Sequence, residues 1–198
     1  VALGSPDRAV SFAVPTGNFG NIYAGYAARA MGLPVGQFIV GSNVNDILPR
    51  FFDSGELTAA GVTPTISPSM DIQISSNFER FLFEIYGRSG ADIKELMRQL
   101  DEEGGFSVNM AQLNEAVFSA GRCDEQETLE TIRQTVKESA KLVDPHTAVG
   151  LKVASDCRRD RTVPMVTLST AHPAKFPAAV EKATSIHPEL PPHMADLF

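Results

Sequence analysis

The amino-acid sequence predicts an α/β protein built on a mainly parallel sheet. Short apolar runs, which are typical of buried strands, alternate along the chain with segments whose apolar residues recur at helical spacing. Strand, helix and strand already follow one another within residues 10–40, and this order implies a right-handed parallel crossover. No internal repeat or low-complexity segment interrupts the alternation. These observations favour one sheet flanked by helices.

The first strand, helix and strand are expected at residues 10–14, 20–31 and 35–40. The first and third segments are continuous apolar runs, and the second carries apolar side chains three and four residues apart. A short helix is expected next, from Asp46 to Ser54, where a glycine follows.

The middle of the chain predicts a loop and then two helices. Residues 56–71 are rich in Pro, Gly, Thr and Ser and have no sustained period, which indicates a loop. Ser76-x-x-Glu79 predicts a capping box for a helix with an apolar stripe, and Ser89-x-x-Asp92 predicts the start of a second helix. Such a stripe is typical of core packing. It consists of Phe78, Phe81, Leu82 and Ile85.

Two further helices are predicted by their capping residues. An apolar run at residues 116–120 indicates a strand, and Asp124-x-x-Glu127 then opens a long amphipathic helix. The acidic residues in its first turns complement the helix dipole, which makes them a solvent face and not a metal site. Asp144, directly before a proline, predicts a helix that extends to Cys157.

The last strand and helix are expected to meet at a polar turn. Residues 163–168 predict the strand, residues 169–172 the turn, and a helix follows with Pro173 near its start. This turn and the glycine-containing turn at residues 16–21 each follow a strand directly. Because ligands of open parallel sheets bind beyond the carboxyl ends of the strands, the two turns could face one crevice.

Composition excludes several classes of function. A formal net charge of -7 and a pI near 5.1 argue against nucleic acid as a partner. No apolar run reaches the roughly 20 residues that a membrane helix needs, and no export signal is visible, so we expect no membrane association and a cytoplasmic location. Cys123 and Cys157 predict small, partly buried thiols, and no His, Cys or carboxylate spacing indicates a metal site.

The turn at residues 16–21, Thr-Gly-Asn-Phe-Gly-Asn, is a candidate phosphate cradle. Two glycines three residues apart let the backbone come close to a ligand, so that amide N–H groups converge at the start of the following helix. The turn matches neither the Walker loop nor the dinucleotide fingerprint. A small phosphate-bearing ligand is the functional interpretation, and a simple chain reversal is the structural alternative.

Four segments, in order, resemble those of one enzyme family. They read VPTGNFGNIYAGYAARAMGLP at residues 14–34, TPTISPSMDIQISSNFERFLFE at 63–84, DPHTAVG at 144–150 and LSTAHPAKFP at 168–177. The chain is similar in these segments to the threonine synthases of the longer, microbial and fungal type. The resemblance implies the tryptophan-synthase-β-like fold (fold type II) and the cofactor pyridoxal 5'-phosphate (PLP).

Cofactor-binding residues follow from the same resemblance. Thr170 would hydrogen-bond the pyridine nitrogen, and His146 and His172 would lie near the ring. Apart from the resemblance, Thr170 is more typical of a helix cap, and histidines at helix starts are usually structural groups. The PLP phosphate would be held, mainly through backbone amides, by Gly17, Asn18, Phe19, Gly20 and Asn21.

The family's reaction converts O-phosphohomoserine and water to threonine and phosphate, and it needs a lysine that carries PLP. In the family that lysine lies upstream of GNFGN, so the resemblance assigns no catalytic residue to this chain. Residues 1–198 would be the C-terminal part of the PLP-binding domain, without the N-terminal half and inactive alone. None of the lysines present stands in the family's Phe-Lys-Asp context: Lys94, Lys137, Lys141, Lys152, Lys175 and Lys182.

Two other functions remain open from the sequence. One is another PLP enzyme of the same fold, such as a threonine dehydratase, although the segment at residues 63–84 matches threonine synthases. The other is a non-catalytic module that binds a phosphate-bearing ligand.

Overall fold

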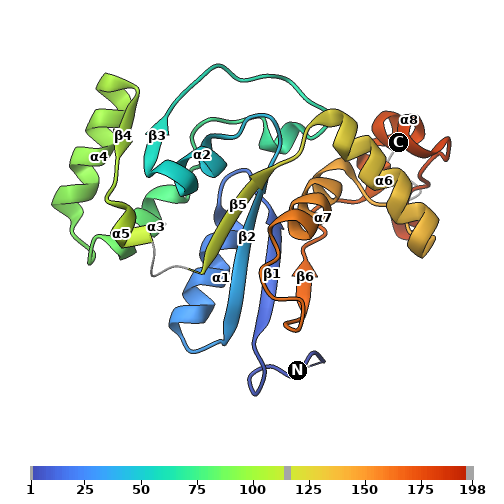
Figure 1. Ribbon diagram of the computed structural model, residues 1–198. Helices are drawn as coiled ribbons and strands as arrows, with labels where there is room; N and C mark the ends of the chain where they lie inside the picture. The colour runs from blue at the N-terminus through green and yellow to red at the C-terminus, as the bar shows by residue number, and fades with distance from the viewer. Residues whose placement is uncertain (1, 114–116, 195–198) are drawn as a thin grey trace.

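Four parallel strands form the central sheet of the protein, in the order β5-β2-β1-β6 (Figure 1). The structure is a computed structural model that describes residues 2–113 and 117–194. The strands are β1 (Val10–Pro15), β2 (Val35–Ser42), β5 (Phe118–Arg122) and β6 (Met165–Thr167). The predicted α/β class with a mainly parallel sheet is confirmed.

Alternate residues of the strands supply two separate cores. Phe12 and Val14 belong to the larger core, whereas Ala13 between them belongs to a smaller one on the other face. The larger core lies under α1 (Gly20–Ala30), α2 (Ile47–Ser54), α3 (Phe78–Ile85) and α4 (Gly90–Glu103). The opposite face is covered by α7 (Pro145–Cys157), against which α6 (Glu125–Ser139) packs, and α8 (Pro177–Thr184) packs in turn against α6. Helices therefore flank both faces of the sheet (Figure 1).

The predicted aromatic stripe lies in the larger core. Phe78, Phe81 and Leu82 are buried, and Ile85 packs against the same cluster. Phe81 contacts Phe118 of β5 edge-on, with ring centroids 5.2 Å apart. The stripe therefore packs α3 against the sheet, as predicted.

The predicted capping residues Ser89, Asp124 and Asp144 are confirmed, and the predicted capping box at Ser76 is wrong. Ser89 accepts a hydrogen bond from the backbone of Asp92, Asp124 and Glu127 form a complete capping box, and Asp144 caps α7. The box at Ser76 is absent: α3 begins after Asn77, with no side-chain cap. The box is absent because of a tertiary contact: the Ser76 N–H, which would donate to Glu79 in a capping box, donates instead to Asn18 Oδ1.

Short elements were missed or misplaced. Residues 56–71, predicted as loop, contain the strand β3 and the 3-10 turn η1, and β3 pairs antiparallel with β4. The last predicted helix is divided at Phe176, because Pro177 disfavours helical geometry in the residue before it. The predicted strand at residues 116–120 begins at Phe118, and Ala116 lies outside the described residues. The remaining elements are β3 (Glu56–Thr58), β4 (Gly105–Ser107), α5 (Met110–Leu113), η1 (Pro68–Met70), η2 (Pro173–Lys175) and η3 (Pro192–Met194).

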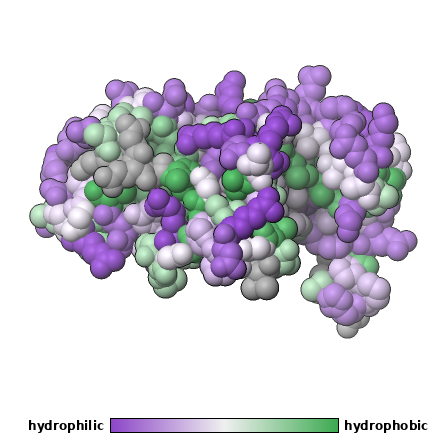
Figure 2. Space-filling view, turned by 60° about the horizontal axis from the view of Figure 1, so that its bottom comes forward, coloured by the Kyte–Doolittle hydropathy of each residue, from purple (hydrophilic) through white to green (hydrophobic). Residues whose placement is uncertain are grey.

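Hydrophobic residues reach the surface across the middle of one face. Figure 2 shows them as a broken band between hydrophilic rims. Among the described residues, no helix is both long enough and apolar enough to cross a membrane.

Candidate functional site

The turn from β1 into α1 forms a small pocket, the candidate anion pocket. Residues 14–22 line a pocket of about 220 Å³. Phe19, the residue before α1, adopts a left-handed conformation with φ of 64°, unusual for a bulky side chain, and its ring is buried against Phe78. This strained residue turns the chain into the helix while its side chain anchors the turn in the core.

Residues 17–21, which line this pocket, carry five consecutive peptide N–H groups. Among the described residues none accepts a hydrogen bond from them, and no side chain caps the start of α1. The free N–H groups and the positive end of the helix dipole together favour a bound anion.

The segment that precedes α3 fixes the carbonyl groups of the turn. Ser75 Oγ donates to the Gly17 carbonyl at 2.6 Å, and the backbone N–H and Nδ2 of Asn77 donate to the Asn18 carbonyl at 3.1 and 3.0 Å. In a trans peptide the carbonyl and the next N–H point in opposite directions. The N–H groups of Asn18 and Phe19 therefore point away from the segment that holds the carbonyls.

A second segment, η1, contacts Gly17 through Ser69. A Cβ built on Gly17 would lie 2.2 Å from the Ser69 carbonyl oxygen, so only glycine fits there. The Ser69 N–H donates to Nε2 of His146, with a donor–acceptor distance of 3.2 Å.

A buried polar chain continues from His146 to the turn after β6. His146 Nδ1 lies 2.8 Å from Asp144 Oδ1, and the Thr147 hydroxyl donates to Asp144 Oδ2. Thr147 Oγ1 also lies 3.4 Å from Ser169 Oγ. Burial alone would raise the pKa of Asp144, but the hydrogen bonds from His146 and Thr147 outweigh it and hold that pKa below its usual value.

The two predicted turns leave the same edge of the sheet. β1 and β6 are adjacent and parallel, with Ala13 opposite Thr167, so residue 16 and residue 170 follow at the same level. Adjacent strands lie about 5 Å apart. Thr170 is exposed at this edge. The helix cap in this turn is His172, whose Nδ1 accepts from the Ala174 N–H at 3.2 Å, and not Thr170.

A polar network that the sequence analysis does not predict holds the loop between β3 and η1 over this edge of the sheet. Asn43 and Asn45, just beyond the end of β2, donate to Asp71 Oδ1 at 2.8 and 3.0 Å. Thr65 donates to the same carboxylate through its hydroxyl at 2.7 Å and its backbone at 2.8 Å. Figure 1 shows the loop between β3 and η1 arching over the carboxyl ends of the strands. Its only sequence signal is the polar run that follows β2.

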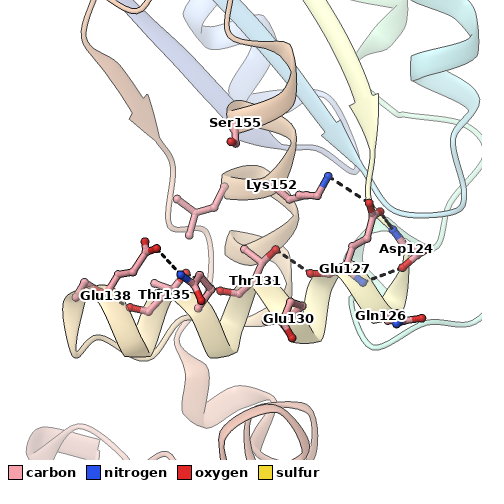
Figure 3. A pocket seen from close by; sticks show the side chains of 12 residues that line it. Asp124, Gln126, Glu127, Glu130, Thr131, Thr135, Glu138, Lys152 and Ser155 are labelled. Atoms are coloured by element: carbon pink, nitrogen blue, oxygen red, sulfur yellow. Dashed lines mark hydrogen bonds and ion pairs between the residues drawn. The ribbon is translucent and has the colours of Figure 1, made fainter.

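A hollow that is larger than the pocket at residues 14–22 lies elsewhere, between α6 and α7 (Figure 3). It measures about 800 Å³ and is lined largely by polar side chains of α6. Lys152 of α7 forms an ion pair across it with Glu127 of α6, and a second ion pair with Asp156 on its own helix. Within the described ranges no group of three or more His, Cys, Asp or Glu could hold a metal ion. On this face of α6, Glu127 pairs with Lys152 and Glu130 pairs with Arg133.

Comparison with known proteins gives consistent matches. Residues 147–198 match the family model described as "Threonine synthase, C-terminal". The threonine synthase of Pseudomonas aeruginosa is 51% identical over 99% of this chain and 42% of its own length. The crystal structure of PLP-bound threonine synthase from Brucella melitensis superposes with a TM-score of 0.95 at 52% identity, over 99% of this chain and 42% of that one.

A yeast relative extends the comparison. The crystal structure of yeast threonine synthase superposes with a TM-score of 0.87 at 36% identity, over 98% of this chain and 43% of that one. The chain therefore spans about 42% of the length of the relatives that it matches.

Proposed function

Because this chain belongs to the threonine synthase family, we propose that the whole protein is a PLP-dependent lyase that converts O-phosphohomoserine and water to L-threonine and phosphate. The observation that carries this proposal is the run of five N–H groups carried by residues 17–21, which line the pocket before α1. A phosphate monoester is the kind of group that such a run binds. The similar Brucella melitensis protein is described as PLP-bound, which supports the choice of cofactor.

The residues present fit PLP at its two ends. Gly17, Asn18, Phe19, Gly20 and Asn21 would bind the phosphate, mainly through their N–H groups. The Thr170 hydroxyl, exposed at the same edge of the sheet, would donate to the pyridine nitrogen. When bound, PLP supplies an electron sink for carbanions. A hydroxyl at the nitrogen, unlike an aspartate, does not favour a protonated ring, so this chain would orient the cofactor more than it activates it.

The domain assignment and the lysine belong to the same proposal. Residues 1–198 would be the C-terminal part of the PLP-binding domain, and the lysine that carries PLP would lie in the remaining length that the relatives have. Lys152 forms one ion pair with Glu127 of α6 and another with Asp156 of its own helix, and the other five lysines are exposed. The 198-residue chain alone would be inactive, and the whole protein would work in the cytoplasm on a small-molecule substrate.

Borohydride reduction of the PLP-loaded whole protein, followed by peptide mass mapping, tests this proposal. We expect PLP on one lysine outside the 198 residues, phosphate release from O-phosphohomoserine by the whole protein, and none by the 198-residue chain. Failure of the whole protein to bind PLP would support the non-catalytic module. Turnover of threonine instead of O-phosphohomoserine would support a dehydratase, and turnover by the chain alone would refute the assignment of the lysine.

Thr170 provides a test at one residue. Thr170→Ala removes the hydroxyl, and we expect kcat of the whole enzyme to fall by at least tenfold, about the 1.4 kcal/mol that a hydrogen bond to such a group is worth. Thr170→Ser keeps the hydroxyl and is the matched control. Equal kcat values for wild type and the alanine variant would exclude the role at the nitrogen.

A further inference from the structure

The structure points to Asp144 and His146 as positioning residues for the anion pocket. We propose that His146 accepts the Ser69 N–H, holds η1 against Gly17, and thereby sets how tightly the loop at residues 17–21 binds a phosphate group. The ligand here is the PLP phosphate, so the inference rests on the proposed function.

The hydrogen bonds of His146 show which of its ring nitrogens donates and which accepts. The Asp144 carboxylate is fully buried and accepts from the backbone of His146 at 2.9 Å and from the Thr147 hydroxyl. An ionised carboxylate only accepts, so the contact with His146 Nδ1 at 2.8 Å requires a proton on Nδ1. In the neutral ring Nε2 is then the acceptor, and it faces the Ser69 N–H at 3.2 Å.

The imidazole has little freedom to adopt another orientation. Its side chain is 4% exposed, and the Phe176 ring packs over it with centroids 4.7 Å apart. The only titratable side chain that hydrogen-bonds it within the described chain is Asp144, and the contacts from η1 and from Phe176 are uncharged. Nε2 is therefore held where it meets Ser69.

Ser69 needs this acceptor because it lies in the first turn of η1. The N–H groups at the start of a helix have no partner within it. The N–H groups of Met70 and Asp71 are satisfied by the Ser67 and Pro68 carbonyls, whereas the Ser69 N–H is satisfied by His146. In η1, the Ser69 N–H is therefore held by His146 of α7, and the Ser69 carbonyl lies against Gly17.

This contact connects the buried pair to the pocket. The Ser69 carbonyl fills the position that a Cβ on Gly17 would take, and Ser75 fixes the Gly17 carbonyl from the other segment. Gly17 is therefore held between two segments, which keeps its N–H and that of Asn18 in place before an anion arrives. Loss of the His146 acceptor releases one of the two segments and leaves the other intact.

Two substitutions of His146 separate positioning from folding. His146→Gln carries an amide oxygen that reaches the Nε2 position and keeps an acceptor for Ser69. His146→Asn places its amide at the Nδ1 position, where it pairs with Asp144 but does not reach Ser69. In the whole enzyme we expect the Asn variant to bind PLP about tenfold more weakly than wild type, the effect of one hydrogen bond. The Gln variant should stay within about threefold of wild type on the same reasoning.

Hydrogen exchange gives a readout that does not depend on activity. In the Asn variant the Ser69 amide should exchange faster, whereas the Thr65 amide, which donates to Asp71, should be unchanged. Inorganic phosphate as a competitor of PLP should lose affinity in parallel, whereas pyridoxal, which lacks the phosphate, should not. Unchanged PLP affinity and unchanged Ser69 exchange in the Asn variant would overturn the inference.

The wild-type enzyme provides a test that needs no variant. In nitrogen-15 histidine spectra of the PLP-loaded protein we expect His146 with a proton on Nδ1 and a bare Nε2. The opposite tautomer would overturn the inference even if neither variant folds. Wild-type protein that binds no PLP at all would instead contradict the proposed function, so the two failures are distinguishable.

Discussion

Gly17 shows how one residue connects the sequence signal to the pocket. Its neighbours supply the N–H groups, but its own contribution is the absence of a side chain, since the Ser69 carbonyl occupies the space. The sequence predicts that this glycine lets the backbone come close to a ligand. It does not predict the approach of the Ser69 carbonyl, because Ser69 is brought there by the fold.

Gly17→Ala is expected to weaken PLP binding by at least tenfold in the whole enzyme. The new Cβ would meet backbone at 2.2 Å, so the turn or η1 must shift. The cost in stability should be about 1–3 kcal/mol, measured by urea unfolding. Gly61→Ala is the matched control, because a Cβ there meets nothing within 4 Å. Equal PLP affinity for both variants would show that the turn tolerates the displacement.

The roles of the other residues around the pocket can be predicted only in part from the sequence. A sequence motif indicates Asn18 and Phe19 as candidates, and the structure adds that Phe19 has a left-handed backbone conformation and a buried side chain. The hydrogen bond from Ser69 to His146 was not predictable, because local pattern carries no information about two segments that meet only in the folded chain.

Among the elements, capping signals succeeded where the cap is local. Asp124 and Asp144 bond to N–H groups two or three residues away, so short-range sequence is sufficient. Ser76 failed because its backbone binds Asn18 across the fold. β3 and β4 were missed for a related reason: each has three residues, and the pairing of Leu57 with Phe106 is set by tertiary contact.

Asp144, the cap of α7, should make stability depend on pH in a defined direction. Its pKa is depressed in the folded state: burial raises it, but the hydrogen bonds from His146 and Thr147 lower it more. A depressed pKa contributes stability above the unfolded value, near 3.9, and that stability is lost as pH falls through the folded pKa. Most of the loss is therefore expected below about pH 4.

The measurement is urea unfolding between pH 7 and pH 3. Wild type should be more stable than Asp144→Asn at pH 7, and the difference should shrink below about pH 4. Asp101→Asn, at an exposed position on α4, is the control and should follow wild type throughout. A difference from Asp144→Asn that stays constant over the whole range would mean that the carboxylate acts through shape and not through its charge.

For the whole molecule, the fold class was predictable and the strand order was not. Apolar runs of parallel strands are recognisable because both faces of the sheet are covered. The order β5-β2-β1-β6 depends on β5 pairing with β2 and β6 pairing with β1 across most of the chain. Period and composition identify strands but do not determine which strands become neighbours.

β6 is an edge strand of the described sheet, so its outer side is a place where further chain of a longer protein would pair. The Ser11 N–H donates to the Pro164 carbonyl, and the Leu168 N–H donates to the Ala13 carbonyl. In a parallel pair every second residue of a strand bonds to the same neighbour, so Val166, between Pro164 and Leu168, directs its N–H and carbonyl toward β1. The N–H groups of Met165 and Thr167 then point outward, and within the described residues no strand pairs with them. An open edge of half-buried residues is a site where further chain can pair or pack.

Hydrogen exchange on the 198-residue chain and on the whole protein tests this edge. If the whole protein is as long as these relatives, which are more than twice the length of this chain, we expect the amides of Met165 and Thr167 to exchange rapidly in the chain alone and slowly in the whole protein. The Val166 amide, bonded to β1, should be protected in both and reports that the sheet is formed. If Met165 and Thr167 exchange equally fast in both proteins while Val166 is protected, the edge stays open and the remaining chain packs against other surfaces, such as the hydrophobic band in Figure 2.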